Sequence, residues 1–376
     1  LGVGLFVACF SVAPLCAISA LLALLYPLLP RAAYARAAAF LQEQFLTAFV
    51  FFFERGRGSR LSVYVSGDVD ASGKVRCLGK EGGADGLRGA LIVCNHVAAH
   101  GDWAPIYSLV ARQGVGALGG FRCVVKDVAK WIPGFGWGMW LMNWPFLKRN
   151  WASDKRYLED KLRAYDGAAS GVPLSMLIFP EGTRWTVKKH AQAVAFAKQR
   201  GLHVPTHTMC PRYKGFQALV RGLSAGACAD VVYDVTLSYT GFNMKAGRKG
   251  PGPFNVFLHD VKPGAPECAF HMHVRRLSLA DVDAKDDAAL KAALFDWFAR
   301  KDAMMEEFLA GSKRFPGAVK LDPLPASRWL PATLFTLAQT ALFVRAVRVL
   351  YTAAWLLLFH REVHASMLKM LYSFRD

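Results

Sequence analysis

The sequence is poor in acidic residues and lacks any cysteine pattern that would build a disulfide or zinc framework. It has 28 Asp and Glu against 46 Lys and Arg, a formal net charge of +18. Its eight cysteines are scattered and never form C-x-x-C, so we expect reduced thiols facing the cytosol. Zinc-finger spacing and RNA-binding motifs are also missing, which argues against nucleic acid. The charge therefore points to an anionic lipid surface and anionic substrates.

Charged residues are absent from residues 2–29, a length sufficient to cross a bilayer. No basic segment precedes this run and no clear cleavage pattern follows it, so we predict an uncleaved anchor rather than a signal peptide. A second apolar run at 38–53 contains Gln42-Glu43-Gln44, which favours an interfacial helix. The arginines that flank both runs favour the cytosolic side. Residues 1–58 are thus assigned to an N-terminal membrane anchor and interfacial helix.

Residues 59–325 alternate between strand-like and helical patterns, which predicts an α/β domain with a layered sheet and flanking helices. The expected strands are 61–65, 90–94, 121–125, 174–179, 231–239 and 254–259, and the expected helices are 102–112, 154–166, 187–200 and 288–309. The last part, 326–376, is apolar again over 330–359, but Arg345 and Arg348 would be costly inside lipid. We predict a C-terminal membrane-associated hairpin there.

The first motif with chemical content is Asn95-His96, which follows the apolar run Leu91-Ile-Val-Cys94, with Asp102 downstream. A carboxylate that bonds one ring nitrogen fixes the tautomer of an imidazole, and the other nitrogen can then act as a general base. A histidine near a helix start is also a common surface or capping residue. The pair alone therefore leaves both interpretations open.

The second motif is Phe179-Pro-Glu-Gly-Thr-Arg184, which follows another apolar run. Pro180 ends the strand, Gly182 permits a tight turn and Thr183 can cap the next helix. Arg184 would then lie beside free backbone N–H groups, an arrangement that suits a phosphate monoester. A plain strand-to-helix turn with a surface arginine would show the same pattern.

A third segment, 126–151, combines tryptophans with Gly, Pro and basic residues, and it ends in Phe146-Leu-Lys-Arg-Asn-Trp151. Such a surface can lie against lipid tails while its cations meet head groups. For the tryptophans we favour the alternative, a packed amphipathic helix. His271 and His273 alternate on one expected strand face, and no Asp, Glu or Cys completes a zinc-like set with them or with His259. We therefore expect a structural strand and no metal.

Together these motifs resemble the glycerolipid acyltransferase family, which contains the 1-acylglycerol-3-phosphate acyltransferases. The resemblance covers about residues 90–310. The family block Phe-Pro-Glu-Gly-Thr-Arg is matched without change, Phe-Ile-x-Arg is approximated at 146–149, and a Pro-containing block is matched at 204–216. The segments 148–151, 233–236 and 271–276 are similar to eukaryotic members that acylate lysophosphatidic acid or lysocardiolipin.

The resemblance implies a glycerol-3-phosphate acyltransferase-like fold and transfer of an acyl chain from acyl-CoA to the free, sn-2 hydroxyl of a lysophospholipid, lysophosphatidic acid first. It implies a protein bound to the endoplasmic reticulum membrane, with its catalytic domain in the cytosol and no metal or cofactor besides the co-substrate acyl-CoA. The catalytic residues it implies are His96 and Asp102. The residues it implies for substrate binding are Arg149, Glu181, Gly182, Thr183 and Arg184, with Asn95, His100, Lys126 and Lys148 as auxiliary candidates.

One departure from the family concerns the catalytic block. Five residues separate His96 from Asp102, where the family has four. Within a continuous helix the extra residue would rotate the acid by about 100°. We favour a bulge at Gly101 that absorbs it, while a role for His100 and an inactive site are the alternatives.

The resemblance leaves other functions open. One is the remodelling of lysocardiolipin or of another lysophospholipid. Another is a CoA-independent transacylase that takes its acyl group from phospholipid. A third, of a different class, is a silent homologue that binds lipid without turnover.

Overall fold

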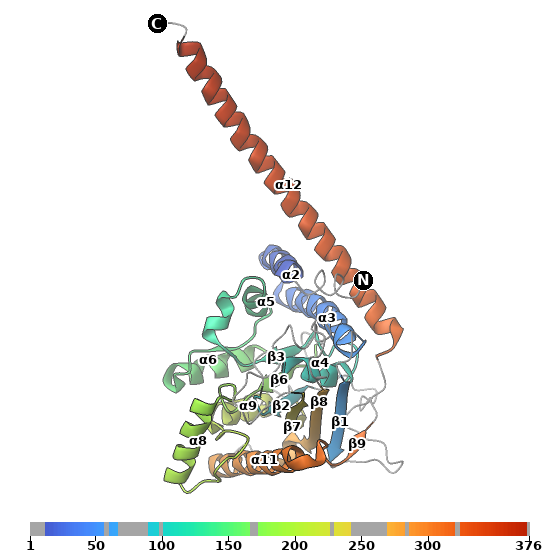
Figure 1. Ribbon diagram of the computed structural model, residues 1–376, viewed down its shortest axis with the longest axis vertical. Coiled ribbons are helices and arrows are strands. Elements are labelled where there is room, and N and C mark those ends of the chain that lie inside the picture. Colours follow the sequence, from blue (N-terminus) through green and yellow to red (C-terminus); the bar gives the residue numbers. More distant parts are fainter. Residues whose placement is uncertain are drawn as a thin grey trace.

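The computed structural model describes residues 12–55, 60–66, 89–97, 101–165, 172–225, 229–241, 269–282, 286–319 and 324–373. A seven-stranded sheet with the order β3-β6-β2-β7-β8-β1-β9 forms its centre (Figure 1). The strands of this sheet are β1 (Arg60–Ser66), β2 (Ala90–Cys94), β3 (Phe121–Cys123), β6 (Ser175–Ile178), β7 (Val231–Thr240), β8 (Ala269–Ser278) and β9 (Ala318–Val319). A separate pair is formed by β4 (Val125–Lys126) and β5 (Phe146–Leu147).

The strands next to the motifs run parallel. β2 pairs with β6 on one side and β7 on the other, both in parallel, and β7 pairs with β8 in antiparallel fashion. Every residue of β2 is buried, as expected for a central strand covered on both faces. The predicted α/β class is confirmed. The expected strand at 254–259 lies outside the described residues, and the one at 121–125 divides into β3 and β4.

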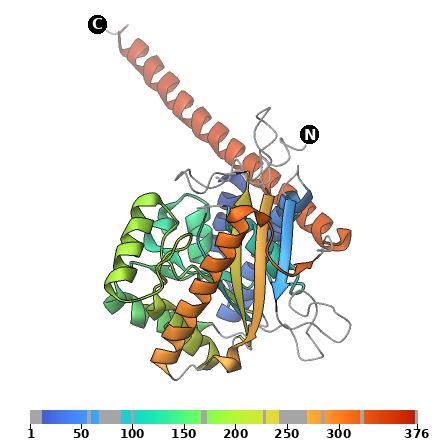
Figure 2. The same ribbon diagram turned by 60° about the horizontal axis from the view of Figure 1, so that its bottom comes forward.

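Helices cover both faces of the sheet (Figures 1 and 2). On one face, Ile92 and Cys94 belong to an apolar cluster with α3 (Arg31–Arg55) and α4 (Trp103–Ala111). On the other, Leu91 and Val93 belong to a cluster with α6 (Trp151–Ala164), α9 (Tyr213–Ala225) and α11 (Asp287–Glu307). The remaining elements are α2 (Val12–Leu25), η2 (Asp127–Trp131), α5 (Phe135–Leu141), α8 (Val187–Gln199), η5 (Leu279–Asp281), η6 (Phe308–Ser312) and α12 (Ala326–Ser373).

The four helices expected in the catalytic domain are present as α4, α6, α8 and α11, whereas α9 was not expected. Polar caps explain where two of them begin. Asn150 Oδ1 accepts from Ala152 N at 3.1 Å at the start of α6, and Asp286 Oδ1 accepts from Ala288 N at 2.7 Å at the start of α11. Cys16, Cys94, Cys123 and Cys210, the cysteines within the described ranges, are free thiols as predicted.

The N-terminal helices are built into the domain. Gln42 Nε2 donates to Leu118 O at 2.7 Å and to Phe121 O at 2.8 Å, and Glu43 Oε2 accepts from Gly119 N at 2.8 Å. Two of the three polar residues that indicated an interfacial helix, Gln42 and Glu43, are therefore buried, where they satisfy the main chain that leads into β3. α2 packs against α5, and Ser19 Oγ donates to Gly134 O at 2.8 Å.

The C-terminal segment differs from the expected hairpin, because it forms one continuous helix of 48 residues. The sequence offers no Gly or Pro between Pro331 and the end of α12, so nothing breaks the helix. Its first turns pack on the domain: the Trp329 ring stacks on Phe51 at 3.8 Å, and Arg328 Nη1 donates to Ala111 O at 2.5 Å. The rest projects away (Figure 1). Residues 326–356 are long and apolar enough to cross a membrane.

Candidate active site

His96 and Asp102 meet just beyond the end of β2. His96 Nδ1 lies 2.7 Å from Asp102 Oδ2, and the side chain of Asp102 is fully buried while that of His96 is 17% exposed. The Tyr239 hydroxyl donates to the other carboxylate oxygen of Asp102. With Nδ1 committed to the carboxylate, Nε2 is the ring nitrogen that can act on a bound molecule.

The extra residue in this block does not separate the pair. Gly101 and Asp102 lie in a turn, and α4 begins only at Trp103. Because the acid precedes the helix, the expected rotation of about 100° does not arise. Residues 98–100, and with them His100, lie outside the described residues.

The main chain of His96 is fastened to the loop after β6. His96 N donates to Glu181 Oε2 at 2.9 Å, and Trp185 N donates to His96 O at 2.9 Å. The other oxygen of Glu181 accepts from Met209 N at 3.1 Å. Phe179 stacks on the His96 ring, with 4.3 Å between centroids. Glu181 is buried, and this burial raises its pKa to about 8 against the two N–H bonds, which lower it. Glu181 thus holds the two motifs together.

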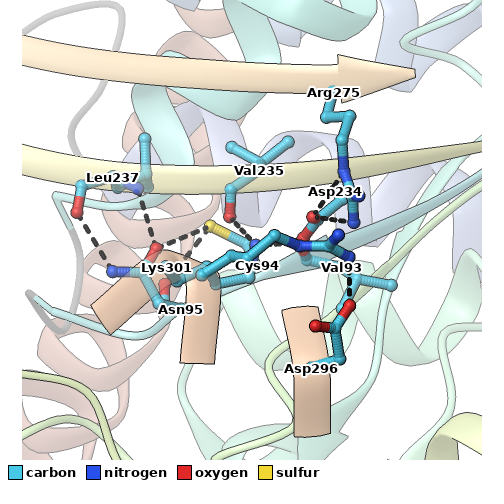
Figure 3. A network of polar contacts seen from close by, with 10 residues as sticks. Val93, Cys94, Asn95, Asp234, Val235, Leu237, Arg275, Asp296 and Lys301 are labelled. Carbon is cyan, nitrogen blue, oxygen red and sulfur yellow. Dashed lines mark hydrogen bonds and ion pairs between the residues drawn. The ribbon is translucent and has the colours of Figure 1, made fainter. Parts of the chain in front are cut away.

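A second polar network fixes the end of β2 from the side (Figure 3). Asn95 Nδ2 donates to Leu237 O at 3.0 Å, and Leu237 N donates to Asn95 Oδ1 at 2.7 Å. Lys301 is fully buried, donates to Val235 O at 2.6 Å and bonds Asp234. Arg275 Nη2 donates to the second oxygen of Asp234 at 2.8 Å. Asn95, expected as an auxiliary residue, therefore joins β2 to β7.

The Gly182 turn brings arginines together. Gly182 has φ 68°, which a larger residue rarely adopts, and a Cβ there would lie 3.2 Å from Arg212 Cδ. Arg149, itself at φ 66°, donates through Nη2 to Gly182 O at 2.5 Å. The Lys189 ammonium donates to the Thr183 hydroxyl, and the Arg184 side chain is exposed.

The positive charges around this turn act on one another electrostatically. Partial burial and the nearby charges of Arg149, Arg184 and Lys126 lower the pKa of Lys189. Burial and Arg212 lower the pKa of Arg149. Across the described ranges, none of these five side chains forms an ion pair with a carboxylate. We call Lys126, Arg149, Arg184, Lys189 and Arg212 the cation cluster. Its repulsion is relieved when an anion binds.

The structure places most of the predicted residues in three groups, with Lys148 outside them. His96 and Asp102 are in contact, and Arg149, Gly182, Thr183, Arg184 and Lys126 belong to or adjoin the cation cluster. Asn95 and Glu181 bond the main chain. Lys148 is exposed, and its N donates to Asp154 Oδ1 at 3.0 Å.

Three residues that contact Asp102 or belong to the cation cluster were missed: Tyr239, Lys189 and Arg212. Arg212 lies in the Pro-containing block at 204–216, which was a usable signal. Lys189 lies in the first turn of α8, five residues after Arg184, and its ammonium reaches Thr183 of the same loop. Tyr239 had no local signal, because its contact with Asp102 depends on the pairing of β2 with β7.

Comparison with known proteins gives a consistent result. The family model described as Acyltransferase matches residues 74–237, and that described as Acyltransferase C-terminus matches 264–337. The chain is 32% identical over 232 residues to 1-acyl-sn-glycerol-3-phosphate acyltransferase 2 of Arabidopsis thaliana, covering 62% of this chain and 54% of that protein. It thus spans about half the length of this plant relative.

Two mouse proteins are similar over a larger share of their length. 1-Acyl-sn-glycerol-3-phosphate acyltransferase epsilon of Mus musculus is 30% identical over 318 residues, covering 82% of this chain and 79% of that protein. Lysocardiolipin acyltransferase 1 of Mus musculus is 29% identical over 269 residues, covering 69% of this chain and 66% of that protein.

Proposed function

Because this chain belongs to the glycerolipid acyltransferase family, which contains the 1-acylglycerol-3-phosphate acyltransferases, we propose that it transfers a fatty acyl chain from acyl-CoA to the sn-2 hydroxyl of a lysophospholipid. Lysophosphatidic acid is the proposed acceptor and phosphatidic acid the product. One observation carries this proposal. The His96–Asp102 pair is joined through Glu181 to the loop that carries Arg184, and within the described residues the cation cluster around that loop has no carboxylate partner.

In the proposed mechanism His96 Nε2 removes the proton from the acceptor hydroxyl as its oxygen attacks the thioester carbonyl. Asp102 stabilises the imidazolium that forms, and Tyr239 keeps the carboxylate in place. The tetrahedral intermediate then collapses, the C–S bond breaks, and the imidazolium returns its proton to the departing CoA thiolate. The products are the acylated lipid and free CoA, with His96 again neutral.

The cation cluster supports a phosphate monoester as the recognised group. A monoester carries close to two negative charges at neutral pH, and planar guanidinium groups such as those of Arg184 and Arg149 bond its oxygens in pairs. Lysocardiolipin, the acceptor in the name of one mouse relative, has singly charged phosphodiesters instead. It is the second candidate acceptor.

We further propose that the protein works at the cytosolic face of the endoplasmic reticulum membrane, anchored by α12. The side chains of Trp131, Trp137 and Trp140 are 70%, 46% and 61% exposed, so they do not form the packed face expected from sequence. They belong to η2 and α5, beside α2, which in turn contacts α12. Tryptophans at such a position are typical of membrane interfaces.

The test is a transfer assay with the full chain in mixed detergent–lipid micelles. Labelled acyl-CoA is offered with lysophosphatidic acid, lysocardiolipin or lysophosphatidylcholine. Preferential formation of phosphatidic acid, lost in His96→Ala, is the expected result. Labelled phospholipid as the only donor identifies a transacylase, and no transfer from either donor identifies a silent lipid-binding homologue.

A further inference from the structure

A second cationic surface lies away from the His96 site, in a groove between α6 and α9 that ends at the start of α11. The groove holds a cavity of about 580 Å³, and five Lys or Arg side chains line it against two acidic ones. That volume falls within the range of small-molecule sites, roughly 300–1,000 Å³. The basic excess indicates a ligand with several negative charges.

The shape of the groove follows from the packing of the two helices. Gly222 of α9 approaches α6 so closely that a Cβ there would lie 2.4 Å from Leu162 Cδ1, and Ala218 also lines the cavity. On α6 the lining residues Trp151, Lys155, Glu159 and Arg163 recur every fourth position, so they form one stripe along the helix. The stripe is about 18 Å long at 1.5 Å per residue.

The groove begins at the cation cluster. Trp151 starts α6 just after Arg149, whose guanidinium bonds Gly182 O, and Tyr213 starts α9 just after Arg212, whose N donates to Pro180 O at 2.8 Å. Both helices then run back along the sheet, away from the carboxyl ends of β2 and β6. In both overall views they lie on the side away from the projecting part of α12 (Figures 1 and 2). A ligand in the groove would thus extend from the proposed active site into water.

The groove also supplies two kinds of contact. Trp151 and Tyr213 offer aromatic faces, and the Lys291 ammonium lies 5.3 Å from the centre of the Tyr213 ring. Arg221 is engaged with Asp287 at 2.6 Å at the far end. By contrast, among the described residues Lys155 and Lys214 have no carboxylate partner. Aromatic faces beside cations are the combination that binds a phosphorylated nucleoside.

Since acyl-CoA is the donor in the proposed function, on which this inference rests, we infer that the α6–α9 groove binds the 3′-phosphoadenosine diphosphate part of acyl-CoA. The pantetheine arm separates the thioester from this nucleotide. The nucleotide must therefore bind at a distance from His96 on a path that stays in water. The groove meets both requirements, and its excess of cations complements the 3′-phosphate and the diphosphate.

The test uses the full chain in detergent and two acyl donors, palmitoyl-CoA and palmitoyl-N-acetylcysteamine, which has the thioester but no nucleotide. In the double variant Lys155→Glu/Lys214→Glu we expect KM for palmitoyl-CoA to rise at least about tenfold with little change in kcat. The kcat/KM for the short thioester should not change. A charge-matched control is Arg156→Glu/Lys198→Glu, since Arg156 lies next to Lys155 on α6 but is 91% exposed and outside the groove.

Direct binding separates the failure of this inference from failure of the proposed function. Calorimetric titration with adenosine 3′,5′-bisphosphate should show binding that is lost in the groove variant and kept in the control. If wild-type protein transfers from palmitoyl-CoA and the groove variant keeps its KM, the groove assignment is wrong and the function stands. If no acyl-CoA is used at all, the function fails, and unchanged nucleotide binding in the variant overturns the groove as well. Equal displacement by inorganic phosphate would also overturn it, because it reveals a nonspecific anion patch.

Discussion

Two groups of charged side chains flank His96, and they differ in how their charges are balanced. Around Asp234, the cations Lys301 and Arg275 meet one buried carboxylate and two main-chain carbonyls. In the cation cluster, described cations meet one another and a few neutral oxygens, and repulsion lowers the pKa of Lys189. The first group is balanced within the protein, whereas the second has no carboxylate partner among the described residues and is proposed to bind an anion.

The difference assigns the two groups to different tasks. Breaking a buried ion pair exposes the full cost of an uncompensated charge, so the Asp234 group should matter for folding. A largely exposed cluster of like charges should contribute little to the stability of the fold, and we expect its main contribution to come when a ligand binds. Substitutions in the two groups should therefore separate stability from substrate binding.

The largest effect is expected at His96, which lies between the groups. His96→Ala should lower kcat for acyl transfer by about a thousandfold, because the proposed general base is removed. The free energy of unfolding of this variant should change little. The matched control is His190→Ala, whose ring bonds Pro205 O at 3.0 Å and no acid. Retention of wild-type kcat in His96→Ala would end the proposed mechanism.

The next effect concerns the Asp234 group. Lys301→Met should lower the free energy of unfolding by about 3–5 kcal/mol, because Asp234 loses its fully buried partner. Denaturant unfolding measures this change, and transfer per folded molecule should fall far less. Arg300→Met on the same helix, a half-exposed neighbour, should cost less than about 1 kcal/mol. Equal losses in the two variants would contradict the structural role of the Asp234 group.

Substitutions in the cation cluster should weaken substrate binding and leave the stability of the fold nearly unchanged. Arg184→Ala should raise KM for lysophosphatidic acid about ten- to hundredfold, since a charge-assisted contact to phosphate is lost. Its stability should stay within about 0.5 kcal/mol of wild type. Arg200→Ala, at the other end of α8, is the control for charge. A stability loss like that of Lys301→Met would erase the distinction between the two groups.

The smallest effect is a pH dependence from Glu181, which bonds His96 N. Burial raises its pKa to about 8 from an ordinary value of 4.5, so the folded protein keeps a proton that the unfolded chain releases. Its contribution to stability is fully present below pH 4.5, decreases as pH rises and is lost above about 8, at up to about 1.4 kcal/mol per pH unit. In Glu181→Gln, unfolding measured from pH 5 to 8 should lose this slope, and an unchanged slope would assign it to another group.

Sequence reasoning found the parts of the site that are local. β2, the His96–Asp102 contact and the Gly182 turn depend on apolar runs and on residues close in the chain. Tyr239 and Lys301 were not found because their contacts depend on strand order and on α11 lying over β7. A lysine in a helix is normally expected to be exposed. The burial of Lys301 is explained only by its ion pair with the buried Asp234.

The terminal helices show the same limit. Gln42-Glu43-Gln44 suggested a polar interface, but Gln42 and Glu43 instead satisfy the main chain around Gly119. At the C-terminus, Arg345 and Arg348 suggested a hairpin, whereas the absence of helix breakers was the better guide. In both places the sequence showed the composition of the segment, but it did not show what the segment packs against.

Two hydrogen bonds join the main chain of His96 to Glu181 and Trp185, and they thereby also set a distance within the site. They hold the base at a fixed separation from the turn that displays Arg184. If that turn holds the acceptor phosphate as proposed, only a hydroxyl a set number of bonds from the phosphorus reaches Nε2. The backbone would then determine which hydroxyl is acylated. Weakening these two hydrogen bonds should yield a mixture of positional isomers before it abolishes turnover.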